Sequence, residues 1–128
     1  MKEKLINLLN NSYSPYSKFR VAAIVVTNDL KEFNGVNVEN ASYGGSICAE
    51  RNAINSAISN GYKRFDFKSL YVMCDSDIIG TPCFICRATI SEMLNKDCEV
   101  VCMNPKGESK TFKVKDLCPY PFSDDNLK

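Results

Sequence analysis

Six consecutive apolar residues, Val21 to Val26, place the strongest constraint on the fold of this chain. A strand with one face in water alternates apolar and polar side chains, whereas a strand buried on both faces is apolar throughout. The run therefore predicts a central strand in a sheet that is covered on both sides. It is also far shorter than the ~20 apolar residues of a membrane-spanning helix, so we expect no membrane association.

Helical and strand-like patterns alternate along the rest of the chain. We expect helices over residues 2–11, 48–60 and 82–94, and strands over residues 20–27, 32–38, 70–74, 99–103 and 110–114. The turn at Asn28 and Asp29 joins the first two strands as an antiparallel hairpin. We expect residues 115–128 to be irregular apart from a short helical turn. This order predicts a single domain, residues 1–128, of the α/β class: a three-layer α/β/α sandwich around a mixed five-stranded sheet.

The charge balance argues against nucleic acid as a partner. The 128 residues include 16 Lys and Arg and 15 Asp and Glu, which gives a net charge of +1. A polynucleotide backbone is held by a broad basic surface, and no such excess exists here. We therefore expect a small-molecule ligand rather than a nucleic acid.

Cysteine use is unusual, with seven Cys and no His. An odd number cannot pair completely within one chain, and residues 1–13 lack the apolar core of a secretory signal. We therefore expect a cytoplasmic location, with cysteines that serve as thiols or metal ligands. Without His, a zinc site would depend on sulfur and carboxylate ligands, and histidine general bases are excluded.

Two cysteine motifs each fall at the start of an expected helix. Pro82-Cys83-Phe84-Ile85-Cys86 places two sulfurs on one face of a first turn, where the helix dipole favours thiolate. Such a pair fits a thiol–disulfide oxidoreductase, half of a zinc site, or chance. Cys48 opens the other helix after a glycine-rich loop. Both helices follow strands, so their N-termini can meet at the same end of the sheet, where open α/β sheets usually bind ligands.

Three thiolates from Cys48, Cys83 and Cys86 would describe a catalytic zinc site with one open position. A water molecule there would have a lowered pKa, and Glu50 would take its proton. Arg51 could donate hydrogen bonds to sulfur and offset the negative charge of the cluster. A fourth ligand, for which Cys74 is the nearest candidate, would instead make the zinc structural and the chain a non-enzymatic interaction module.

Taken together, Cys48-Ala49-Glu50-Arg51 and Pro82-Cys83-x-x-Cys86 resemble the zinc-dependent cytidine deaminases, in the small homotetrameric form that acts on free nucleosides. Three further segments, residues 14–21, 35–44 and 117–123, resemble the family in the same order. The resemblance implies hydrolysis of cytidine and 2′-deoxycytidine to the uridines and ammonia, in pyrimidine salvage.

The resemblance also implies roles for individual residues. Zinc would be bound by Cys48, Cys83 and Cys86, and Glu50 would move protons between water, N3 of the base and the leaving amine. Phe19 would stack against the base, and the Ala49 N–H would bind the base carbonyl. Asn37 and Glu39 would bind the ribose 3′-hydroxyl. In a homotetramer, further contacts would come from three residues of neighbouring subunits: Ala41, Tyr43 and Phe122.

Three positions depart from the family pattern. Phe84 stands where the family usually has Gly, and Ala88 follows Arg87 where Gln is frequent. Ala22 follows Val21 in the first strand, where Gly is common. These changes leave open whether a modified nucleoside, a nucleoside antibiotic or a free base is the preferred substrate. Asn37 and Glu39 favour a nucleoside that contains ribose.

Overall fold

The computed structural model describes residues 1–128 and contains one five-stranded sheet with the strand order β2-β1-β3-β4-β5. The strands are β1 (Val21–Thr27), β2 (Glu32–Val36), β3 (Phe67–Cys74), β4 (Glu99–Met103) and β5 (Ser109–Lys113). Only β3 and β4 pair in parallel, while the other neighbours are antiparallel. The mixed sheet and the first hairpin are therefore confirmed.

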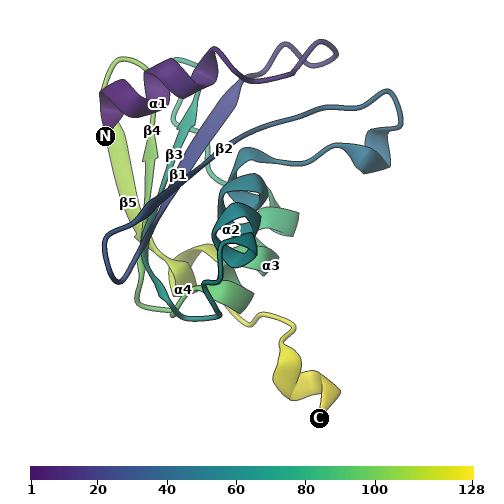
Figure 1. Ribbon diagram of the computed structural model, residues 1–128, viewed down its shortest axis with the longest axis vertical. Helices are drawn as coiled ribbons and strands as arrows, with labels where there is room; N and C mark the ends of the chain where they lie inside the picture. Colours follow the sequence, from purple (N-terminus) through teal and green to yellow (C-terminus); the bar gives the residue numbers. More distant parts are fainter.

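Helices cover both faces of this sheet (Figure 1). The α-helices are α1 (Lys2–Leu9), α2 (Ala49–Ser59), α3 (Phe84–Met93) and α4 (Val114–Leu117), and 3₁₀ turns occur at Tyr43–Gly45 and Asp124–Leu127. Leu5 and Leu9 of α1 pack with Ala22 and Ile24 of β1. The alternate residues of β1 instead face α2 and α3, as expected of a strand buried on both sides. The three-layer arrangement is thus confirmed.

Several boundaries differ from expectation. β2 ends at Val36 rather than Val38. β3 begins at Phe67 rather than Leu70, because Phe67 and Ser69 pair with β1 on either side of a bulge at Lys68. Helix α3 begins at Phe84, since Cys83 is still extended. The short helical turn expected in the tail is α4, which begins one residue early, at Val114. None of the helices has the length and apolar character needed to cross a membrane.

Gly35 allows helix α2 to pack directly on the edge strand β2. A Cβ atom at this position would lie 2.2 Å from the carbonyl oxygen of Ala49 and 2.4 Å from the amide nitrogen of Ala53. Only glycine therefore permits this approach of backbone to backbone. The close packing fixes the first turn of α2, and with it Ala49 and Glu50, against the sheet.

Candidate metal and catalytic site

The N-termini of α2 and α3 bring three cysteines together. Cys48 is the N-cap of α2 and Cys83 is the N-cap of α3, both with extended backbones, while Cys86 lies in the first turn of α3. Their Sγ atoms all lie within 4.8 Å of one another, and those of Cys48 and Cys83 are 3.7 Å apart. Cys48 is the irregular residue before its helix, as the sequence predicted.

This spacing fits a tetrahedral zinc ion. With Zn–S bonds of about 2.3 Å, two sulfurs of a tetrahedron are about 3.8 Å apart. The 3.7 Å separation of Cys48 and Cys83 is close to that value. Sulfur ligands also suit zinc better than magnesium or calcium, which prefer oxygen. The donor set therefore fits zinc and has room for a fourth ligand that is not a cysteine.

The other four cysteines lie outside this group. Cys74 and Cys102 are buried, and burial raises the pKa of their thiols to about 11 and about 12. Cys98 donates to the carbonyl oxygen of Phe67, with the two atoms 3.3 Å apart. Cys74 is thus not a fourth ligand in this geometry, which favours a catalytic rather than a structural metal site.

The cysteine group favours negative charge on sulfur. A hydrogen bond from Cys86 is the main reason that the pKa of Cys48 falls to about 5, and Arg51 and Cys83 contribute to this lowering against the opposing effect of burial. Nη2 of Arg51 lies 3.9 Å from Cys48 Sγ. The same Cys48–Cys86 bond raises the pKa of Cys86. Arg51 therefore offsets charge at the sulfurs, as expected from its position beside Glu50.

Glu50 is buried beside the cysteines, with only 4% of its surface exposed. Burial is the main reason that its pKa rises to about 7, and the charge on Cys48 adds to the effect. A carboxyl group with a pKa near neutrality can both accept and donate a proton under physiological conditions. This is the property required of a group that moves protons between a water molecule and a substrate.

A cavity of about 280 Å³ opens onto these groups. It is lined by seven of the residues singled out from the sequence: Phe19, Asn37, Glu39, Cys48, Ala49, Glu50 and Cys83. Cys74, which the sequence offered as a candidate fourth zinc ligand, also lines this cavity. Sequence reasoning assigned no role to the other three lining residues, Ser17, Val21 and Thr81. Their position was the available signal, because Ser17 and Val21 lie in a segment that resembles the family and Thr81 directly precedes the second cysteine motif.

Asn37 and Glu39 are held by the loops around the cavity. Asn37 Oδ1 accepts from the Val21 N–H at 2.9 Å, and its amide nitrogen donates to the Phe19 carbonyl at 2.8 Å. Glu39 accepts from Ser17 Oγ and from the backbone N–H groups of Tyr16 and Ser17. Asn37 retains one free amide hydrogen and Glu39 retains acceptor capacity, so both can still contact a ligand.

Three predicted substrate contacts do not line this cavity. Ala41, Tyr43 and Phe122 are exposed, and the residues Tyr43 and Phe122 have 78% and 76% of their surface accessible. Tyr43 lies in the segment between β2 and α2, and Phe122 lies in the C-terminal tail; both segments extend from the body of the molecule (Figure 1). Within one chain, these residues do not complete the site.

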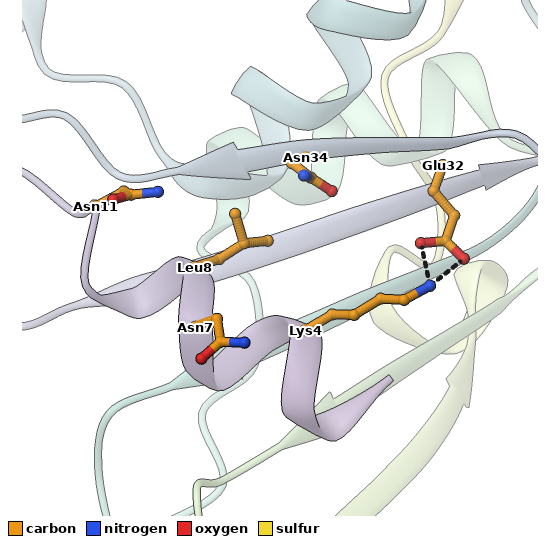
Figure 2. A pocket seen from close by; sticks show the side chains of 6 residues that line it. All are labelled: Lys4, Asn7, Leu8, Asn11, Glu32 and Asn34. Carbon is orange, nitrogen blue, oxygen red and sulfur yellow. Dashed lines mark hydrogen bonds and ion pairs between the residues drawn. The ribbon is translucent and has the colours of Figure 1, made fainter.

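The largest surface cavity, of about 490 Å³, lies elsewhere, between α1 and β2. Figure 2 shows its polar lining, in which Lys4 Nζ donates to Glu32 Oε1 at 2.8 Å. The other lining residues are Asn7, Leu8, Asn11 and Asn34. It contains no cysteine and shares no residue with the cavity at Glu50, so size alone does not identify the reactive site.

Comparisons with known proteins agree with this geometry. Residues 1–103 match the family described as the cytidine and deoxycytidylate deaminase zinc-binding region. A probable cytidine deaminase of Dictyostelium discoideum is 43% identical over 98% of this chain and 86% of its own length. A cytidine deaminase of Sporosarcina psychrophila is 38% identical, over 91% of this chain and 84% of its own.

A solved structure is similarly close. The crystal structure of cytidine deaminase from Burkholderia pseudomallei superposes with a TM-score of 0.90 at 40% sequence identity, and the match covers 94% of each chain. The fold of this chain is therefore the fold of a solved cytidine deaminase.

Proposed function

Since this chain belongs to the family of zinc-dependent cytidine deaminases, we propose that it hydrolyses cytidine and 2′-deoxycytidine to uridine and 2′-deoxyuridine, with release of ammonia. One observation supports this most directly: the buried Glu50 and the sulfurs of Cys48 and Cys83 line one cavity of about 280 Å³. Cavities that bury small ligands begin at about this size.

The proposed zinc ligands are Cys48, Cys83 and Cys86. When bound, zinc supplies Lewis acidity that lowers the pKa of a water molecule at its open position. Glu50 takes a proton from the attacking water and delivers a proton to N3 of the pyrimidine. The remaining hydroxide attacks C4, and Glu50 then takes the proton of the hydroxyl group formed there. It passes this proton to the amino group on C4, which leaves as ammonia as the C4 carbonyl forms. Burial raises the pKa of the Glu50 carboxyl group, which favours its action as an acid as well as a base.

Other chain groups orient the nucleoside in this proposal. Phe19 lines the cavity and would stack on the base. Ala49 is the first residue of α2, so its N–H has no acceptor within the helix and can bind the base carbonyl. The remaining amide hydrogen of Asn37 and an oxygen of Glu39 would bind the ribose 3′-hydroxyl.

We further propose that residues 1–128 act as one domain, in a homotetramer whose sites are shared between subunits. The single sheet supports one domain, and the exposure of Ala41, Tyr43 and Phe122 supports sharing. Seven free cysteines suit a reducing cytoplasm and a role in pyrimidine salvage there.

The substrate is tested by measuring ammonia release from cytidine, 2′-deoxycytidine and a cytosine-containing single-stranded oligonucleotide by the zinc-loaded protein. Release from the two nucleosides and not from the oligonucleotide is expected. No release from either nucleoside would contradict the proposal.

Shared sites are tested by mixing inactive subunits. A subunit with Phe122→Ala still has Glu50, and a subunit with Glu50→Gln still has Phe122. If neighbouring subunits complete each site, a mixture refolded together regains part of the activity that neither variant has alone. A mixture as inactive as its components, although tetrameric by light scattering, would exclude the exchange.

A further inference from the structure

The segment that ends at Cys83 has no regular secondary structure. Residues 79–83 belong to neither a helix nor a strand, and Pro82 has no N–H to donate. Cys83 is also the exposed member of the cysteine group, whereas Cys86 is fully buried. Core packing therefore fixes Cys86, but another interaction must hold Cys83.

Arg87 supplies that interaction. Its Nε donates to the Pro82 carbonyl at 2.7 Å, and its Nη2 donates to Thr81 Oγ1 at 2.8 Å. Its Nη1 donates to the Leu117 carbonyl at the end of α4, at 3.1 Å. A single guanidinium thus joins the two residues before Cys83 to α3 and to the C-terminal part of the chain.

Phe84 in turn holds the guanidinium. Cζ of Arg87 lies 4.6 Å from the centroid of the Phe84 ring, a cation–π distance. Phe84 has 76% of its surface exposed, so the ring contributes little to the core of this chain. The stack covers one face of the guanidinium and limits its rotation, which keeps the three donors directed at their acceptors.

We propose that the Phe84–Arg87 stack is a clamp that positions Cys83 for zinc binding, an inference that rests on the zinc ligands proposed above. Arg87 is a positioning residue, because it acts on the metal ligand through Thr81 and Pro82. Phe84 acts one step further away, through the orientation of Arg87. Lysine cannot replace the arginine, since it lacks the planar fork that reaches three acceptors at once.

The test measures how fast zinc passes from the full-length zinc-loaded protein to a coloured chelator. Arg87→Lys should accelerate zinc loss about 10- to 100-fold, the usual effect of removing a group that orients a metal ligand. Phe84→Ala and Phe84→Leu should accelerate it about 2- to 5-fold, as for a partly exposed cation–π contact. Phe84→Tyr keeps an aromatic ring at this position, so this variant should lose zinc at the wild-type rate.

Ile85→Ala is the matched control. Ile85 follows Phe84 in the first turn of α3 and is 63% exposed, but its aliphatic side chain has no ring with which to form a cation–π contact. Its removal should leave the rate of zinc loss unchanged. The melting temperatures of all metal-free variants are measured in parallel, so that a general loss of stability is separated from loosening of Cys83.

A double-mutant cycle checks the order of action. If Phe84 works only through Arg87, Phe84→Ala combined with Arg87→Lys releases zinc no faster than Arg87→Lys alone. The clamp would be overturned if the two substitutions multiplied each other's effect on the rate of zinc loss, or if Phe84→Ala and Ile85→Ala lost zinc at the same rate. Either result would leave the proposed zinc ligands in place. A wild-type chain that holds no zinc would overturn both.

Discussion

Cys48 Sγ and Cys83 Sγ lie 3.7 Å apart, although the two residues are 35 positions apart in the sequence. Each is the N-cap of a helix, and the two helices lie side by side on the same face of the sheet (Figure 1). The fold therefore assembles a metal site from two separate segments.

Replacing Cys83 by Ser should reduce the zinc content from one ion per chain to nearly none, because two thiolates rarely hold zinc without further ligands. Zinc is measured by atomic absorption on the purified protein. Cys118→Ser is the control, since Cys118 lies outside the cysteine group, and it should keep its zinc. Zinc loss in the control would favour a structural metal with a different set of ligands.

Removing zinc with a chelator should lower the melting temperature. An ion at about 100 times its dissociation constant stabilises the folded state by about 2.7 kcal/mol, which corresponds to roughly 5–10 °C for a chain of this size. Added zinc should reverse the change. Cys83→Ser should melt at the same temperature with and without chelator, and a shift in that variant would contradict a site built on Cys83.

Asn37→Ala should reduce the free energy of unfolding by about 1–3 kcal/mol, because it leaves the Val21 N–H and the Phe19 carbonyl without their partner. Asn34→Ala, an exposed position on the preceding strand β2, should change it by less than about 0.5 kcal/mol. Both are measured by urea denaturation. Equal losses would mean that the bonds of Asn37 contribute nothing to stability.

Stability at acidic pH should depend on Asp29. Hydrogen bonds from Thr27 Oγ1 and Tyr62 Oη lower the pKa of Asp29 below its ordinary value of 3.8. A carboxyl whose pKa is lower in the folded state stabilises the fold above its unfolded pKa, and this contribution disappears as the pH falls through the folded value.

Melting temperatures of the wild type and of Asp29→Asn, measured from about pH 6 to about pH 3, test this effect. The variant should lose less stability over the range. Tyr62→Phe removes one of the two hydrogen-bond donors and should change the curve in the same direction. Identical acid slopes for all three proteins would exclude Asp29 as a contributor.

The sheet and its layers could be predicted because β1 is apolar on both faces and turn residues separate the elements. The meeting of the two cysteine motifs followed from the convergence of helix N-termini on one end of a sheet. Sequence patterns did not reveal the first residues of β3, where Phe67 and Ser69 pair with β1 and Lys68 between them forms a bulge. A short helical turn was expected in the tail, but the position of α4 was not, because so short a helix shows no helical period.

Side-chain contacts between distant segments could not be predicted from the sequence either. Asn37 was expected only at the ribose, but it also ties β1 to the loop after β2. Arg87 was noted only for its neighbour Ala88, whereas its guanidinium reaches Leu117, thirty residues further along the chain. Such bonds depend on distances that exist only once the sheet and helices have packed.

Turnover of cytidine by Glu50→Gln, expressed per bound zinc ion, tests the central claim most directly. The variant keeps the three cysteines and should bind one zinc per chain, but it lacks the carboxyl group that moves protons. Ammonia release should fall at least about 10²- to 10⁴-fold. Wild-type turnover by a variant with full zinc occupancy would contradict the assignment of Glu50 and the mechanism built on it.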